Sequence, residues 1–242
     1  MERARKPDVT IIVVFMVGLT AFAGWWLSHQ RLGAKPWLEE GVIGDFPGSD
    51  RLGPPTAKIG LGVFLAVAGS LFALFLSAYA MRMALLDWRA VPVPPLLWFN
   101  TAVLVLSSGA LQWAVIAGRN DDRDSMMTGL LGAGVAAVIF LIGQLLAWQQ
   151  LISAGFVLQA NPANAFFYLI TAVHGVHLLG GLVALGRTIG KAWRSKVAAP
   201  LRLSVELCAM YWHFLLLIWL ILLAVLTGWP IAFFNVCRQL IS

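Results

Sequence analysis

Six long apolar runs constrain this chain more than any other feature of its sequence. Each run has about 20 residues, the length of helix needed to cross the hydrocarbon core of a bilayer. The runs cover residues 9–28, 59–81, 96–117, 126–148, 165–186 and 203–227, and Glu206 is the only Asp, Glu, Lys or Arg within them. Because a segment in lipid must satisfy its own backbone hydrogen bonds, we predict six membrane-spanning helices.

The composition supports the same fold class. Apolar residues make up 60% of the chain and charged residues 12%, whereas soluble domains carry about 25% charged residues. The apolar runs are continuous rather than alternating, which excludes a transmembrane β-barrel as well as a soluble enzyme core. We therefore predict an all-α, polytopic transmembrane helical bundle. Cationic loops beside a membrane account for the net charge of +6, so we expect no nucleic-acid partner.

The chain divides by composition into three parts. Residues 1–28 are predicted to form an N-terminal transmembrane anchor helix, residues 29–57 an extramembrane segment rich in Pro and Gly, and residues 58–242 a five-helix bundle. The first part resembles a secretory signal peptide, because three cations precede its apolar run and an Ala-Phe-Ala pattern lies within it. We interpret it as an uncleaved anchor.

The distribution of cations between the runs predicts the orientation. With six helices, alternate connecting segments share one side of the membrane, and the two sides carry 11 and 6 Lys and Arg residues. The segment 187–202 alone holds five of them. Because cations concentrate on the inner side, both termini and the residues beside them are predicted to lie on the outer side, and segment 29–57 on the inner side.

Four polar side chains inside the runs are candidates for function: His174, His177, Glu206 and His213. Burial of such groups costs several kcal/mol unless they are paired or hydrated. The histidines could bond to neighbouring helices, or one of them could ligate a haem together with His213 on the last helix. Glu206 could pair with a cation such as Arg202 or take part in a proton relay. The sequence contains no zinc or other metal-binding motif, so we predict no metal site in this chain.

Two motifs resemble a known family. Residues 166–182 read FFYLITAVHGVHLLGGL, which is similar to the F-x-x-x-T-x-x-H-G-x-H-x-x-x-G-L pattern of haem-copper oxidase subunit III, the cytochrome c oxidase subunit 3 family. Residues 205–214 read VELCAMYWHF and are followed by Trp219, which resembles the E-x-x-x-x-Y-W-H-F-x-x-x-x-W motif of that family. The resemblance runs from about residue 58 to residue 226. Asn100-Thr101, Ser107-Ser108 and Gly143-Gln144 are weaker echoes of it.

The chain also departs from the family pattern. It has Ala68, Ala147 and Leu216 where members of the family often carry carboxylates, so the roles of those acids are not carried over. Larger members have seven helices, two of which form a lipid-filled V against the other five. This chain has one predicted helix ahead of the five.

The resemblance implies a function in aerobic respiration. The chain would be a cofactor-free, non-catalytic subunit of a proton-pumping terminal oxidase in a bacterial inner membrane; a mitochondrial inner membrane is the less favoured location. Its partners would be catalytic subunit I and subunit II, with haem and copper held outside this chain, and phospholipid would bind to it. In the family this subunit supports the stability and proton uptake of the catalytic subunit. The electron donor would be cytochrome c or quinol.

Site roles follow from both arguments. We expect His174, His177, Glu206 and His213 to form a structural polar cluster between helices. We expect contacts with another subunit or with lipid at the residues Arg187, Lys191, Arg194 and Trp212.

Three other functions compete with this one. The motifs are shared with the accessory subunit of a nitric oxide reductase. A haem-b electron carrier using His177 and His213 is a different class of protein. A small-molecule transporter is disfavoured because the chain shows no inverted repeat and no broken helices.

Overall fold

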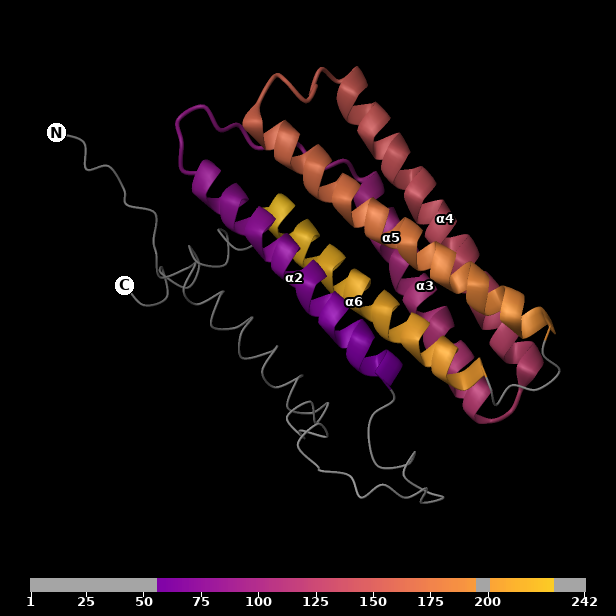
Figure 1. The fold of residues 1–242 in the computed structure, drawn as a ribbon. Coiled ribbons are helices and arrows are strands. Elements are labelled where there is room, and N and C mark those ends of the chain that lie inside the picture. Colours follow the sequence, from indigo (N-terminus) through magenta and orange to yellow (C-terminus); the bar gives the residue numbers. More distant parts are fainter. Residues whose placement is uncertain (1–55, 195–200, 229–242) are drawn as a thin grey trace, which may run out of the picture. The chain divides into compact units, whose positions relative to one another are not determined.

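The computed structural model describes residues 56–194 and 201–228, and the regular structure in these two ranges is helical. The helices are α2 (Thr56–Arg82), α3 (Leu96–Arg119), α4 (Arg123–Ser153), α5 (Pro162–Arg194) and α6 (Arg202–Leu226) (Figure 1). All five are long and apolar enough to cross a membrane. This confirms the all-α prediction for the described part of the chain. The predicted first span, residues 9–28, lies outside the described residues.

The helices extend beyond the apolar runs that predicted them. Helix α5 has 33 residues, a length of about 50 Å, compared with about 30 Å for the hydrocarbon core. Its last two turns carry Lys191 and Arg194 past the end of the predicted span at residue 186. An apolar run marks only the part of a helix that lies in hydrocarbon, whereas the backbone hydrogen bonds continue into the interface.

The chain forms two compact units, Met1–Leu71 and Phe72–Ser242, with the boundary inside α2. In the first unit the described residues are the first part of α2. The second unit contains the remainder of α2 and helices α3 to α6. All contacts discussed below lie within this second unit.

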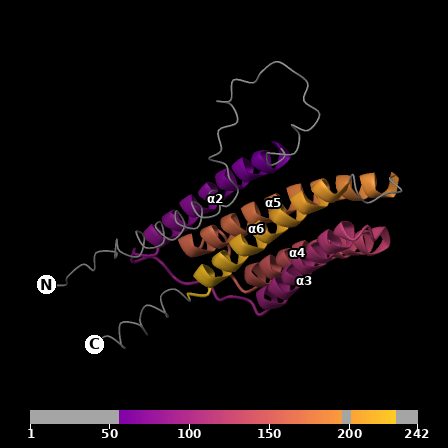
Figure 2. The same cartoon turned by 90° about the horizontal axis from the view of Figure 1, so that it is seen from below.

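In the second unit, α3 packs against α4 and α6, and α5 packs against the same two helices. Figures 1 and 2 show α3 and α4 lying side by side along their length. Their packing is close at Gly129, where an added Cβ would lie 2.8 Å from the Ala110 carbonyl oxygen. At Gly181 on α5, an added Cβ would lie 2.7 Å from the ring of Tyr211 on α6. These glycines set the distance between the helices because no larger side chain fits.

A three-residue turn joins α3 to α4. Asp122 caps α4, since its carboxylate accepts a hydrogen bond from the Ser125 backbone N–H at 3.1 Å. Hydrogen bonding by the Ser125 side chain and backbone N–H holds the pKa of Asp122 below its ordinary value. Asp121 has a φ of 58°, a left-handed conformation that Asp tolerates better than most residues. Arg202 stabilises the turn from the start of α6, because its guanidinium lies 2.7 Å from the Asp121 carboxylate and donates to the Gly118 carbonyl oxygen at 2.8 Å.

Candidate functional site: polar contacts between the spans

A row of polar contacts follows the interface between α3 and α6 from one end of the pair to the other. We call it the α3–α6 polar row, and it consists of the pairs Thr101–Trp219, Ser107–Trp212, Ser108–His213, Gln112–His213 and Arg119–Glu206. Its α3 members Thr101 and Ser108 are seven residues apart, as are Trp212 and Trp219 on α6. A separation of seven residues is two helical turns, so each set lies on one face of its helix.

Two fully buried indoles occupy the row. Trp219 donates its indole N–H to the Thr101 hydroxyl at 2.9 Å, and Trp212 donates to the Ser107 hydroxyl at 2.8 Å. The Ser107 hydroxyl in turn donates to the Ala133 carbonyl oxygen on α4 at 2.8 Å, so this chain of bonds links three helices. Trp212 was predicted to contact a subunit or lipid, but its exposed fraction is 0%. Its large ring is instead enclosed by the chain's own helices.

His213 lies between two polar residues of α3. Its Nδ1 is 2.5 Å from the Ser108 hydroxyl, and its Nε2 is 3.1 Å from the Gln112 side-chain oxygen. That oxygen can only accept, so Nε2 carries the proton and Nδ1 accepts from Ser108. Both ring nitrogens of a neutral imidazole are therefore engaged. Ligation of a haem iron by His213 would require one of these contacts to break.

Glu206 lies at the basic end of the bundle. Its carboxylate accepts from the Arg119 guanidinium at 3.2 Å. Arg202, the cation that the sequence suggested for it, is bound to Asp121 instead. The Arg119 side chain is 62% exposed, and ion pairs of this kind contribute about 1 kcal/mol or less.

His174 is enclosed by aromatic rings. Its exposed fraction is 0%, and its ring centroid lies 6.3 Å from that of Phe72, 5.9 Å from that of Phe140 and 5.1 Å from that of Trp219. Neither of its ring nitrogens has a hydrogen-bond partner among the described residues.

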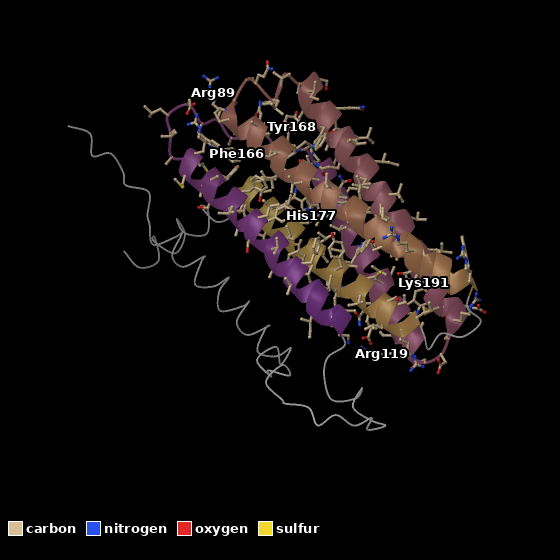
Figure 3. All side chains as sticks on the ribbon, in the orientation of Figure 1. Arg89, Arg119, Phe166, Tyr168, His177 and Lys191 are labelled. Atoms are coloured by element: carbon tan, nitrogen blue, oxygen red, sulfur yellow. The ribbon has the colours of Figure 1, made fainter. Side chains whose placement is uncertain are left out.

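His177 lies one turn further along α5, where its Nδ1 is 2.8 Å from the Val173 carbonyl oxygen. Its own carbonyl oxygen accepts from the Tyr211 hydroxyl of α6 at 2.7 Å. Figure 3 labels His177 midway along the bundle. The side chains of the four polar residues picked from the sequence thus meet different partners: Glu206 an arginine, His213 two side chains of α3, His174 aromatic rings, and His177 a carbonyl oxygen of its own helix and the Phe72 ring.

The predicted lipid-contacting cations share one exposed face. Arg187, Lys191 and Arg194 are all exposed, and they are spaced four and three residues apart at the end of α5. Figure 3 shows Lys191 and Arg119 at one end of the helices and Arg89 at the opposite end. Arg123 joins α4 to this region by donating to the Ala192 carbonyl oxygen at 3.1 Å.

Sequence reasoning did not assign roles to the hydroxyls of α3 or to two buried amides. Asn100 and Gln144 have exposed fractions of 0% and 4%, and their amide atoms have no hydrogen-bond partner among the described residues. The spacing of Thr101 and Ser108 could have indicated a shared face, but it could not identify the indoles opposite them. In the described ranges, no group of three or more His, Cys, Asp or Glu side chains is placed to hold a metal ion.

Comparison of the sequence with known proteins identifies a family. The family model "Cytochrome c oxidase subunit III" matches residues 61–231. A cytochrome c oxidase subunit 3 from Thermostichus vulcanus is 27% identical over 181 residues, covering 72% of this chain and 87% of the relative. A probable cytochrome c oxidase subunit 3 from Nocardia farcinica is 31% identical over 140 residues, covering 56% of this chain and 63% of the relative.

Mycobacterial relatives give a similar result. A probable cytochrome c oxidase subunit 3 from Mycobacterium tuberculosis is 28% identical over 139 residues, which covers 57% of this chain. The aligned part spans 65% of the length of that relative. The family model covers well over half of the chain and includes all of the α3–α6 polar row. The chain therefore belongs to the cytochrome c oxidase subunit III family.

Proposed function

We propose that this chain is a non-catalytic subunit of a haem-copper terminal oxidase in a bacterial inner membrane. Catalytic subunit I and subunit II are its partners, and they hold the haem and copper. The family match and the bacterial sources of the relatives described above support this assignment. The complex oxidises cytochrome c or quinol, reduces dioxygen to water and pumps protons, while this chain stabilises the catalytic subunit and sustains its proton uptake.

The observation that carries the proposal is how the polar side chains of the spans are used. The indoles of Trp212 and Trp219 and the imidazole of His213 are bound to side chains of α3. Glu206 is bound to Arg119 at the end of the same helix. These groups join helices of this chain to one another, as a packing subunit requires. Glu206 and His213 accordingly have structural roles between helices. We assign such roles to His174 and His177 as well, because both rings pack on Phe72 of α2.

The basic end of the bundle faces the inner side of the membrane in this proposal. Arg187, Lys191 and Arg194 present one exposed cationic face there and bind anionic lipid head groups. Residues 1–28 anchor the chain in the membrane, residues 29–57 lie on the inner side, and both termini lie on the outer side.

Purification through a tag on this chain, followed by native mass spectrometry, tests the proposal. We expect haem- and copper-containing subunits to accompany the chain in mild detergent, and the complex to reduce dioxygen. Purification of the chain alone with a bound haem would overturn the proposal. Reduction of nitric oxide but not dioxygen by the purified complex would reassign the chain to a nitric oxide reductase.

Glu206→Ala provides a second test. We expect it to weaken assembly of the complex while the haem absorbance of the assembled fraction is unchanged. Loss of the haem band from assembled complex would contradict a structural role.

A further inference from the structure

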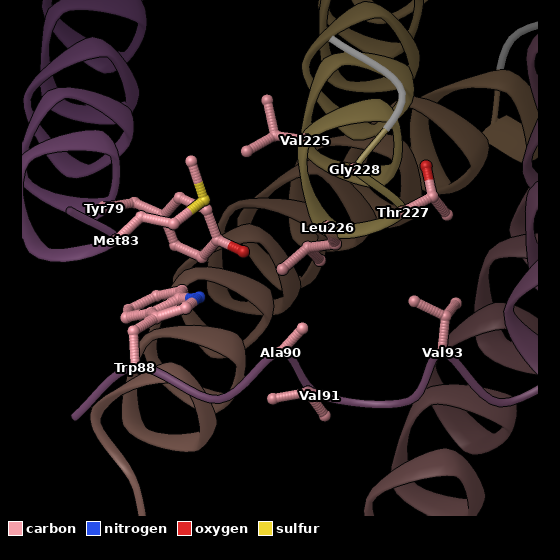
Figure 4. A pocket seen from close by; sticks show the side chains of 10 residues that line it. All are labelled: Tyr79, Met83, Trp88, Ala90, Val91, Val93, Val225, Leu226, Thr227 and Gly228. Carbon is pink, nitrogen blue, oxygen red and sulfur yellow. The ribbon is translucent and has the colours of Figure 1, made fainter. Parts of the chain in front are cut away.

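A pocket of about 520 Å³ lies where α2 and α6 end, opposite the basic end of the bundle (Figure 4). Tyr79 and Met83 line it from the last turn of α2 and just beyond, Trp88, Ala90 and Val91 from the connection that follows, and Leu226 from the end of α6. Its size is within the range of small-molecule sites. Because two spanning helices end here, the pocket lies at the level where hydrocarbon gives way to the ester groups of membrane lipids.

Two hydrogen-bond donors face this pocket. Figure 4 shows the Tyr79 hydroxyl and the Trp88 indole nitrogen on the side of their rings that faces the pocket. Neither group donates a hydrogen bond to the described residues, and the Tyr79 side chain as a whole has an exposed fraction of 7%. Neither donor atom is sealed inside the protein, so a ligand in the pocket can reach both. A ligand that brings an acceptor oxygen into the pocket gains their hydrogen bonds.

The two donors are held in place by their neighbours. Both terminal nitrogens of Arg82 donate to the Asp87 carboxylate, at 2.8 Å and 2.5 Å, which folds the connection back toward α2. Trp88 then packs edge-on against Tyr79, with ring centroids 4.8 Å apart and an interplanar angle of 89°. The ring of Phe166 on α5 packs edge-on against the Tyr79 ring, with their centroids 5.8 Å apart. The phenol and the indole are therefore positioned as a pair before a ligand arrives.

The chemistry of the walls limits the ligand. None of the residues that line the pocket is charged, and the remaining walls are aliphatic. The Thr227 hydroxyl at the rim already donates to carbonyl oxygens of its own helix. A phosphate would find no cation in this pocket, whereas a neutral carbonyl with an alkyl chain fits both the donors and the walls.

We propose that this pocket binds the ester region of a membrane glycerolipid. An ester carbonyl oxygen accepts from the Tyr79 hydroxyl and the Trp88 indole N–H, and the attached acyl chain packs on Met83 and Leu226. This site is separate from the cationic face at the other end of α5, and its chemistry differs because it recognises an uncharged group.

The experiment measures lipids retained by the full chain, purified in mild detergent with whatever subunits accompany it. The preparation is re-lipidated with an equal mixture of a diester phospholipid and the diether analogue with the same head group, which lacks the carbonyls. We expect the wild type to retain the diester over the diether by about fivefold for each hydrogen bond, or about 25-fold for the two donors together. Tyr79→Phe and Trp88→Phe should each reduce that preference, and the double variant should abolish it.

Two further variants separate this site from general lipid binding. Ala90→Trp fills the pocket from an exposed position on the connection, and it should release one lipid per chain. Trp98→Phe is the matched control, because Trp98 is 51% exposed at the same end of the helices and does not line the pocket; its diester preference should equal that of the wild type. Equal retention of diester and diether by the wild type would overturn the proposal. The proposal would also be overturned if a ubiquinone analogue displaced the retained lipid from the wild type and displaced none from Ala90→Trp. The pocket would then be a quinone site.

Discussion

At the scale of single residues, hydroxyl groups of α3 connect buried indoles to the backbone. The Thr101 hydroxyl accepts from Trp219 and donates to the Leu97 carbonyl oxygen at 2.7 Å. The Ser107 hydroxyl has the same double role toward Trp212 and Ala133. Each hydroxyl satisfies a donor that cannot reach water. The loss of one of these hydroxyls should therefore lower the free energy of unfolding more than the loss of a hydrogen bond at the surface.

Thr101→Val tests this role, because it replaces the hydroxyl with a methyl group of similar size. We expect the free energy of unfolding to fall by about 1–3 kcal/mol, since the Trp219 N–H loses its acceptor in a buried position. The measurement is denaturation of the purified protein in mixed detergent.

Thr128→Val is the control for this change. The Thr128 hydroxyl also donates to a carbonyl oxygen one turn back, at 2.9 Å, but it is exposed and accepts no indole. Its substitution should change the free energy of unfolding by a few tenths of a kcal/mol. An equal loss in both variants would show that the indole contact contributes nothing.

At the scale of helices, α3 and α4 are held together by small residues and by the turn between them. Gly129→Ala should destabilise the protein, because the added methyl group would lie 2.8 Å from the Ala110 carbonyl oxygen and 2.9 Å from the Ala114 Cβ. Overpacking of this kind costs about 1–3 kcal/mol. The measurement is the melting temperature of the variant and of the wild type in the same detergent.

Gly132→Ala is the matched variant on α4. Its nearest atom would be the Ala110 Cβ at 4.0 Å, so the methyl group fits without displacement. Since Ala favours a helix over Gly by about 1 kcal/mol, this variant should be neutral or more stable than the wild type. If Gly129→Ala were as stable as Gly132→Ala, the close approach of α3 and α4 at Gly129 would not limit which residues fit there.

The turn between α3 and α4 gives a pH dependence. Hydrogen bonds from Ser125 lower the pKa of Asp122 below 3.8 in the folded protein, so the contribution of the cap is present above that value. It is lost as pH falls through the folded pKa. The melting temperature should therefore fall on acidification. Asp122→Asn keeps a capping side chain but removes this titration, so its melting temperature should depend less steeply on pH.

At the scale of the whole molecule, charge differs between the two ends of the helices. The ends of α3 and α5 and the starts of α4 and α6 gather cations at one end. The opposite end has Arg82, which is bound to Asp87, and Arg89. This asymmetry supports the proposed orientation.

Replacement of Arg187, Lys191 and Arg194 by Gln tests the proposed cationic face. We expect the ratio of anionic to zwitterionic phospholipid retained by the triple variant to be lower than that of the wild type. The reason is that each cation near a membrane surface contributes roughly 1 kcal/mol to binding of anionic lipid. Quantitative lipid extraction from the purified protein is the measurement. Arg89→Gln, at the opposite end, should leave the ratio unchanged, and a similar shift in both variants would contradict a specific face.

The sequence by itself determined the positions of the described spans and the family. Both depend on local information, because the length of an apolar run decides whether a helix can cross a membrane. The two motifs on α5 and α6 can likewise be read along a single segment. The five described helices and the family match at residues 61–231 confirm these predictions.

Only the tertiary structure decided which groups meet. Glu206 pairs with Arg119 on α3, whereas Arg202, four residues away in sequence, pairs with Asp121 in the α3–α4 turn. Trp212 is buried among this chain's own helices, whereas the sequence predicts that it contacts another subunit or lipid. Partner choice depends on how each helix is rotated about its axis and on contacts between residues far apart in the chain. Neither property is contained in the spacing of residues along one helix.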